Sequence, residues 1–313
     1  MKPIVYNLPG EFLEKLKTIY PSDYPKICET FLHKKEQTFR INYLKTDLFH
    51  LREDLGREGI RCREIHWPKG SFILRSGAKD LRKSPLYLEG KVYMQNVSSM
   101  IPPILLNPQK DEKILDMCAA PGAKTTQIAS LVGSDIELVA LEKMEVRFQK
   151  LLATLRIQGA GFVNARLLDG FWVKEKYSAY FDKILLDAPC SGEALFEVHN
   201  PKTYGFWNEK RVKEVSRRQK ILIASAIPSL KKGGELVYST CTFSPEENEE
   251  IIDWALSKFK EIEMVPIQIP IPNIKIGLTG WKGKRYSSYL RLALRILPNE
   301  VMEGFFIVKM RKT

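Results

Sequence analysis

The chain has 313 residues, of which 44% are hydrophobic, and its 49 Lys and Arg outnumber its 37 Asp and Glu to give a formal net charge of +12. This length and composition exclude a disordered or fibrous chain and fit one large domain plus a small one. The basic balance favours a polyanionic partner, although a solvated basic surface has the same composition. No apolar run of about eighteen residues and no signal-peptide pattern occur, so we expect a cytoplasmic protein without a membrane partner.

Cysteine and histidine usage gives no sign of a metal site. The cysteines are odd in number and form no Cys-x-x-Cys pair, which argues against a disulfide framework and a structural zinc site; they are Cys28, Cys62, Cys118, Cys190 and Cys241. The four histidines show no ligand spacing. We therefore expect metal-independent chemistry.

The first part of the chain, residues 1–99, predicts a small α/β appendage. An amphipathic helix is expected over 11–20, a strand over 37–44, a helix over 47–59 and extended pieces through 70–77. The segment is also rich in basic residues that we expect to include RNA contacts: Lys34, Lys35, Arg40, Arg57, Arg61, Arg63, Lys79, Arg82 and Lys83.

The second part, residues 100–313, has a regular rhythm of apolar strands and helices. Strands are expected over 113–117, 136–142, 161–169, 181–189 and 234–240, with helical patterns such as 143–158 and 208–230 between them. This alternation indicates βαβ units and a mostly parallel sheet with helices on both faces. The segments 262–269 and 303–310 are expected to add edge strands, with an antiparallel insertion at the end. Ligands of such sheets bind beyond the carboxyl ends of the strands.

The segment "ILDMCAAPGAKTTQIASL", residues 114–131, predicts a strand, a tight turn of small residues and a helix. Ala119, Ala120 and Gly122 leave room for a ligand beside the backbone, and the helix that opens at Ala123 presents free N–H groups. The turn matches neither the dinucleotide nor the phosphate-loop glycine pattern, so NAD and ATP are less favoured than another nucleotide-like cofactor.

Acidic residues follow the next two strands. Glu142 is placed to accept hydrogen bonds from ribose hydroxyls, and Asp169 to accept one from an adenine amine. Each has an equally good structural alternative, since Glu142 would also favour a helix N-terminus and Asp169 would suit a turn before glycine. Together with the first loop they indicate an adenosine pocket.

Two cysteines stand at the ends of two further strands. "DAPCSG", residues 187–192, contains Cys190, and "STCTFSPEEN", residues 239–248, contains Cys241. The Ser-Pro-Glu-Glu after Cys241 predicts a helix start that fixes this loop. A single cysteine in such a place would suit a nucleophile, and two imply a division of roles.

The motifs "DMCAAPGAKT", "DAPCSG" and "YSTCTFSPEENE", in this order, resemble those of the RNA cytosine-C5 methyltransferases of the Nop2/NSUN/RsmB-RsmF family. "FRINYLK", "YMQNVSSM" and "RILPNEVMEGFFIVKMRK" match the same family, so the resemblance covers residues 37–312. It implies a Rossmann-like S-adenosylmethionine-dependent methyltransferase domain over 100–313 and an RNA-recognition-like appendage over 1–99. The implied cofactor residues are Cys118, Ala119, Ala120, Pro121, Gly122, Lys124, Glu142, Arg147, Asp169 and Asp187.

The resemblance also implies covalent catalysis. Cys241 is expected to add to C6 of cytosine as the nucleophile, and Cys190 to help resolve the adduct once C5 carries the methyl group. Asp187 is expected to contact N3, and Lys124 to contribute positive charge. Because DNA cytosine-C5 enzymes use the cysteine of a Pro-Cys pair for attack, Cys190 is the rival nucleophile.

The chain departs from the family pattern at two places. Ala194 stands where glycine is usual, Phe196 to Val198 replace a basic pair, and Asn299 stands where histidine is frequent. These changes leave the contacts to RNA open, and a few of the following basic residues are expected to make them instead: Lys202, Lys210, Arg211, Lys213, Arg217, Arg218 and Lys220. Trp207 and Trp281 either stack on bases or are buried.

The expected function is therefore 5-methylcytosine formation in RNA by a monomeric enzyme. We expect 16S rRNA as the target, with tRNA as the alternative. The second cysteine motif argues against a DNA methyltransferase, while the departures leave open an RNA-binding assembly factor with little turnover.

Overall fold

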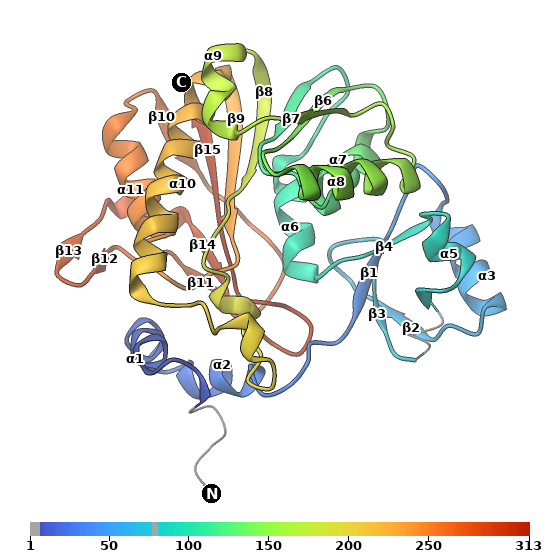
Figure 1. Ribbon diagram of the computed structural model, residues 1–313, viewed down its shortest axis with the longest axis horizontal. Helices are drawn as coiled ribbons and strands as arrows, with labels where there is room; N and C mark the ends of the chain where they lie inside the picture. Colours follow the sequence, from blue (N-terminus) through green and yellow to red (C-terminus); the bar gives the residue numbers. More distant parts are fainter. Residues whose placement is uncertain (1–6, 77–80) are drawn as a thin grey trace, which may run out of the picture.

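The computed structural model describes residues 7–76 and 81–313 and shows a large sheet beside a small one (Figure 1). Lys79, one of the predicted RNA contacts, lies outside the described residues. The large sheet has the strand order β11-β14-β15-β9-β8-β5-β6-β7, with β10 paired to β15. Its parallel part confirms the five predicted strands: β5 (Lys113–Asp116), β6 (Glu137–Glu142), β7 (Asn164–Leu167), β8 (Phe181–Asp187) and β9 (Leu230–Thr240).

The remaining strands of the large sheet are antiparallel, which confirms the expected insertion at the end of the chain. They are β10 (Ile262–Val265), β11 (Ile274–Ile276), β14 (Leu294–Ile296) and β15 (Phe305–Lys312). A short hairpin of β12 (Gly280–Trp281) and β13 (Lys284–Arg285) and the 3-10 turn η5 (Ser288–Leu292) lie between β11 and β14 in the chain.

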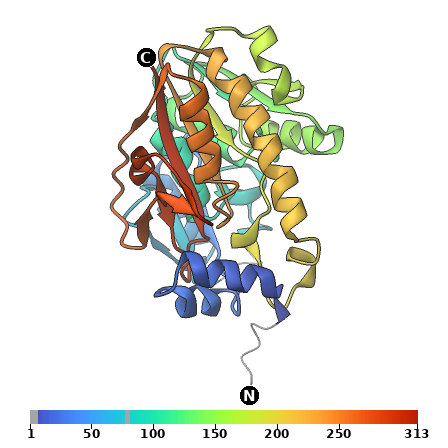
Figure 2. The same ribbon diagram turned by 90° about the vertical axis from the view of Figure 1, so that its left-hand side faces the viewer.

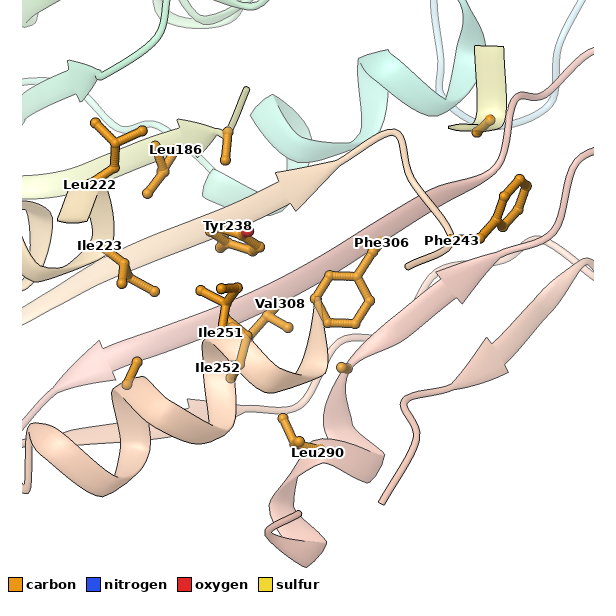
Figure 3. Close-up of a cluster of buried hydrophobic side chains, with 14 of the residues drawn as sticks. Leu186, Leu222, Ile223, Tyr238, Phe243, Ile251, Ile252, Leu290, Phe306 and Val308 are labelled. Atoms are coloured by element: carbon orange, nitrogen blue, oxygen red, sulfur yellow. The ribbon is translucent and has the colours of Figure 1, made fainter. Parts of the chain in front are cut away.

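Helices cover both faces of this sheet because successive strand residues point to opposite sides. Leu186 and Tyr238 pack in one apolar cluster with residues of α10 (Glu209–Ser229) and α11 (Glu249–Lys258) (Figure 3). Their neighbours Leu185 and Val237 pack in the other cluster, with residues of α6 (Val97–Leu106), α7 (Ala123–Val132) and α8 (Glu145–Ile157). The short elements η2 (Gly170–Trp172) and α9 (Val173–Lys176) connect β7 to β8, and η3 (Glu193–Leu195) and η4 (Pro201–Thr203) lie before α10.

The small sheet confirms the predicted N-terminal α/β fold. Its antiparallel strands are β1 (Thr38–Ile41), β2 (Cys62–Glu64), β3 (Ser71–Leu74) and β4 (Val92–Met94), in the order β2-β3-β1-β4. One face carries Phe39 and Phe72, whose rings stack with centroids 5.1 Å apart. They share a core with Leu51 of α3 (Leu48–Arg57) and Leu86 of α5 (Pro85–Leu88).

Arg40 on β1 joins the small sheet to the first loop-and-helix unit of the large domain. Its Nη2 donates to Ala123 O and to Thr126 Oγ1, both at 2.9 Å, and its Nε donates to Gln95 Oε1 at 2.7 Å. Burial lowers the pKa of the Arg40 guanidinium to about 9. Since only 4% of this residue is exposed, the prediction that Arg40 contacts RNA is wrong.

The first two helices, α1 (Gly10–Ile19) and α2 (Tyr24–Thr30), lie beneath the large sheet and away from the small one (Figures 1 and 2). The Phe12 ring packs against Phe196 at 4.8 Å and against Trp207 at 5.8 Å between centroids. Residues 7–31 therefore share their core with the large domain, and the division of the chain at residue 99 stays a prediction. Over residues 7–76 and 81–313, no helix combines the length and hydrophobicity needed to cross a bilayer.

Candidate active site

The two motif cysteines meet at the carboxyl ends of β8 and β9. These strands are parallel neighbours, and Asp187 lies opposite Ser239. Cys190 follows Asp187 by three residues and Cys241 follows Ser239 by two, so both cysteines lie beyond the same end of the sheet. Their sulfur atoms are 3.3 Å apart, both side chains are half-buried, and both thiols are free. This confirms that the two motifs belong to one site.

The two thiols share a hydrogen bond. The hydrogen bond to Cys241, together with burial, raises the pKa of the Cys190 thiol well above its usual value. Cys190 therefore keeps its proton and can donate it in a hydrogen bond to the Cys241 sulfur.

Lys124 and Asp187 form an ion pair in the same region. Lys124 Nζ, from the first turn of α7, lies 2.6 Å from Asp187 Oδ2 and donates to Ser99 Oγ at 2.8 Å. Ser239 Oγ donates to the other oxygen, Asp187 Oδ1, at 2.7 Å. Phe305 lies against this pair, with its ring centroid 5.6 Å from Lys124 Nζ. The Lys124 charge is thus balanced by Asp187.

A cavity beside the ends of β5, β6 and β7 brings together Cys118, Glu142, Arg147 and Asp169. Glu142 Oε1 accepts from the backbone N–H groups of Lys143 and Met144, both at 2.9 Å, and Oε2 lies 3.3 Å from Arg147 Nη1. These backbone hydrogen bonds lie just before α8, so Glu142 has the helix-start role that is the alternative prediction for it. Because a carboxylate has about four acceptor positions, the local bonds leave room for a ribose.

Asp169 likewise combines a local backbone hydrogen bond with a contact to an arginine. Its Oδ1 accepts from Phe171 N at 3.2 Å, as expected for a turn, and its Oδ2 lies 3.1 Å from Arg218 Nη2. Arg218 was expected among the phosphate contacts, but it lines this cavity. The set of two carboxylates with two arginines fits a polar, hydroxyl-rich group such as an adenosine.

The loop from Cys118 to Lys124 is held closely against this cavity. Gly122 has φ +109°, and a Cβ there would lie 3.0 Å from the Thr154 side chain, so a glycine is needed at this position. Arg147 Nη2 donates to Ala120 O at 2.7 Å. Ala119 and Ala120 are buried and pack in the apolar cluster with α7 and α8. Burial raises the pKa of the Cys118 thiol, which favours packing over chemistry. Pro121 lies in the same turn.

The site also contains residues that the sequence did not single out: Ser99, Ser239 and Phe305. No sequence pattern distinguishes these residues, because serine and phenylalanine are common in helices and strands that have no functional role. Arg218 was identifiable only as one basic residue among several on α10.

The departures from the family pattern have structural explanations. Phe196 and Val198 are buried and extend the core toward α1. Asn299 Oδ1 accepts from Val301 N at 2.9 Å and from Met302 N at 2.8 Å, which closes the turn before β15. Ala194 is also buried.

Both tryptophans offered as base-stacking candidates are buried. Trp207 Nε1 donates to Glu193 Oε1 and Trp281 Nε1 to Glu246 Oε1, each at 2.9 Å. The stacking alternative is therefore wrong for both residues. The helix start after Cys241 is corrected too, because α11 begins only at Glu249 and its N-cap Asn248 makes no side-chain capping bond.

Comparison with known proteins places these features in a family. Residues 103–311 match a family model described as 16S rRNA methyltransferase RsmB/F, and residues 8–97 match the N-terminal domain of 16S rRNA methyltransferase RsmF. A tRNA (cytosine(49)-C(5))-methyltransferase of Pyrococcus abyssi is 37% identical, with 88% of each chain covered. Ribosomal RNA small subunit methyltransferase F of Vibrio campbellii is 33% identical over 100% of this chain, which spans only 64% of that relative.

The fold agrees with a solved structure of the same length. The crystal structure of a methyltransferase homolog protein from Pyrococcus horikoshii superposes with a TM-score of 0.86 and 30% identity, and all of both chains is covered. These matches establish S-adenosylmethionine as the cofactor and confirm the resemblance drawn from the motifs. The chain belongs to the RsmB/RsmF family of S-adenosylmethionine-dependent RNA cytosine-C5 methyltransferases.

Proposed function

We propose that the protein methylates C5 of a cytosine in 16S rRNA through a covalent bond between the Cys241 sulfur and C6 of the base. The observation that carries this proposal is the 3.3 Å contact between the Cys190 and Cys241 sulfurs beside the Lys124–Asp187 ion pair. Residues Cys118 to Lys124, with Glu142, Arg147, Asp169 and Asp187, would hold the cofactor, which supplies an electrophilic methyl group when bound.

The first step is the addition of the Cys241 thiolate to C6. A new S–C6 bond forms, and the π electrons of the ring move toward N3. Asp187 is proposed to contact N3, with Lys124 and Ser239 holding both of its oxygens. A proton shared between Asp187 and Lys124 can neutralise the charge that develops on N3. C5 becomes nucleophilic and takes the methyl group.

The second step returns the enzyme to its starting state. A base removes the C5 proton, the C5=C6 double bond re-forms, and the S–C6 bond breaks to release the Cys241 thiolate, while N3 returns its proton to the Asp187–Lys124 pair. Cys190 suits this role because its pKa is raised chiefly by Cys241. Once the Cys241 sulfur is bonded to carbon, that hydrogen bond is lost, and Cys190 more readily gives its proton to water. Cys190 would thus become a base only after the adduct exists.

Methyl transfer from tritiated cofactor to RNA tests this function. The purified protein should label 16S rRNA that lacks 5-methylcytosine, and bisulfite sequencing should show one or more cytosines that resist conversion. Tight RNA binding without any label would instead favour the assembly factor with little turnover.

A tRNA target is the second candidate, and sequence identity favours it. The tRNA-modifying relative of Pyrococcus abyssi is 37% identical to this chain, whereas the Vibrio campbellii RsmF is 33% identical. The family models, by contrast, are described for 16S rRNA over both parts of the chain. Labelling of total tRNA but not of 16S rRNA would decide for tRNA.

We further infer that residues 1–99 recognise RNA, that residues 100–313 carry out the chemistry, and that the enzyme is a cytoplasmic monomer without a metal. Basic side chains that remain exposed within residues 1–99 support RNA binding; they are Lys34, Arg57, Arg61, Arg63, Arg82 and Lys83. On and before α10 the exposed ones are Lys202, Lys210, Arg211, Lys213 and Arg217, whereas Arg218 and Lys220 are half-buried and paired.

A further inference from the structure

A buried glutamate that the reaction scheme does not use lies beneath the two thiols. Glu247 follows Cys241 by six residues and is 0% exposed. Its Oε2 accepts from Ser191 N at 2.8 Å and from Gln219 Nε2 at 3.1 Å. The same Gln219 Nε2 donates to Pro189 O at 2.9 Å. The residues on both sides of Cys190 are therefore tied to this carboxyl group.

Glu247 also contacts the loop of the other cysteine. Thr242 Oγ1, from the residue after Cys241, lies 3.4 Å from Glu247 Oε1 and 2.8 Å from Ser191 Oγ. The backbone oxygen of Glu247 accepts from the Tyr238 hydroxyl on β9 at 2.7 Å. One side chain thus joins the two loops that carry the thiols.

We propose that Glu247 is a positioning residue whose carboxyl group holds the Cys190 loop against the Cys241 loop and keeps the two sulfurs in contact. Its effect on catalysis rests on the proposed function, because the contact matters through adduct formation and release. The effect on thiol geometry does not depend on RNA or cofactor.

The charge of Glu247 matters as well as its shape. Burial, followed by the negative charge of Glu193, raises the pKa of Glu247 to about 8, so the group is neutral at neutral pH. The titratable groups around Glu247 are Glu193, Cys190 and Tyr238. Lys15 lies in the same region, and its Nζ donates to Ser244 Oγ at 3.2 Å. Ionised Glu247 raises the pKa of the Cys190 thiol and so opposes its use as a base.

The variant Glu247→Gln separates position from charge. Its Oε1 can accept from Ser191 N and Gln219 Nε2 as the wild-type Oε2 does, and its amide can donate to Thr242 Oγ1, so it copies the neutral acid. Glu247→Ala removes all of these contacts. Glu246→Gln is the matched control, because Glu246 lies next to Glu247 but pairs with Lys15 and Lys282 at the edge of the site.

Two measurements test the proposal. The first is the lifetime of the covalent RNA adduct between about pH 6.5 and pH 9.5, and the second is the rate of Cys190 alkylation by iodoacetamide without RNA, followed by mass spectrometry. At about pH 7 Glu247→Gln should match the wild type within about threefold. Above about pH 8, the wild-type adduct should last about tenfold longer than that of Glu247→Gln, because ionised Glu247 raises the pKa of the Cys190 thiol. Cys190 alkylation should be slower in the wild type by a similar factor.

The remaining outcomes are also informative. Glu247→Ala should resolve the adduct slowly at every pH while Glu246→Gln follows the wild type. Equal pH profiles for the wild type and Glu247→Gln in both assays would overturn the effect of the Glu247 charge, and normal kinetics for Glu247→Ala would overturn the positioning role. If the wild type transfers no methyl group, the proposed function fails, and the alkylation rates still decide the role of Glu247. Melting temperatures identify any variant that fails to fold.

Discussion

Replacing Cys190 by alanine should trap the enzyme on its RNA. The substitution removes a half-buried thiol 3.3 Å from the Cys241 sulfur and leaves Cys241 free to add to C6. It also deletes the group proposed to accept the C5 proton, so release of Cys241 from the methylated base becomes the slow step. Truncating one partly buried sulfur should cost about 1 kcal/mol of the free energy of unfolding, which preserves the fold.

The size of the effect follows from the role of the thiol. A positioned general base contributes about 10²–10⁴-fold to a proton-transfer step, and the median turnover number of enzymes in general is about 10 s⁻¹. The adduct lifetime should then rise from roughly 0.1 s to roughly 10–1000 s. A species that lasts this long survives denaturation and migrates as a protein–RNA band on a denaturing gel.

The assay compares Cys190→Ala, Cys241→Ala and the double variant on radiolabelled RNA in the presence of cofactor. Only Cys190→Ala should give the slow band, and adding Cys241→Ala should abolish it. Cys62→Ala is a matched control, because Cys62 is a half-buried free thiol on β2 of the small sheet. A band with Cys241→Ala and none with Cys190→Ala would reverse the two roles.

Three further substitutions test the fold and the cofactor loop. Burial raises the pKa of Asp116 to about 6, so the folded state binds this proton more tightly than the unfolded state does. The free energy of unfolding should therefore fall by about 3 kcal/mol as the pH rises from about 4 to about 6, and Asp116→Asn should remove this slope in urea titrations. Arg295→Met should lower the free energy of unfolding by about 3–5 kcal/mol, since it leaves the fully buried Glu249 carboxylate unpaired. Gly122→Ala should weaken cofactor binding about tenfold in calorimetry, because its φ of +109° and the Thr154 contact force the loop to move.

Each of these three substitutions has a matched control substitution elsewhere in the chain. Asp135→Asn changes an exposed acid paired with Lys110 and should keep the wild-type pH slope. Arg311→Met breaks a partly exposed pair with Glu235 and should cost no more than about 1 kcal/mol. Gly133→Ala also has positive φ, but nothing lies near its Cβ position, so it should leave cofactor affinity unchanged. Equal effects in a variant and its control would contradict the stated cause.

The parallel sheet and the meeting of the cysteines could be predicted because both depend on local patterns. Apolar strands followed by helices give βαβ units, and such units bring consecutive strand ends to one edge of the sheet. Once Cys190 and Cys241 were assigned to two strand ends, their proximity followed. The positions of Glu142 and Asp169 at strand ends could be predicted in the same way. Each also accepts hydrogen bonds from nearby backbone N–H groups, as the alternative roles at a helix start and in a turn require.

What could not be predicted depends on how distant elements pack. Arg40 and Arg61 are both arginines in a basic segment, yet Arg40 is buried against α7 while Arg61 is exposed. The difference arises because the neighbours of Arg40 come from Gln95 and residues 123–126, far along the chain. Arg218 joins Asp169 across 49 residues for the same reason.

The polar residues after Cys241 show most clearly why composition alone misleads. A stretch of Thr, Ser, Glu and Asn is typical of an exposed turn, but Thr242, Ser244, Glu247 and Asn248 are all buried. Burying so many polar groups is costly unless each finds a partner, and here Glu193 alone accepts from Thr242, Ser244 and the Phe243 backbone. A network satisfied in this way has few alternative arrangements, so it fixes the backbone on which both thiols sit. Substitutions within it should therefore slow the chemistry at positions that never touch the base.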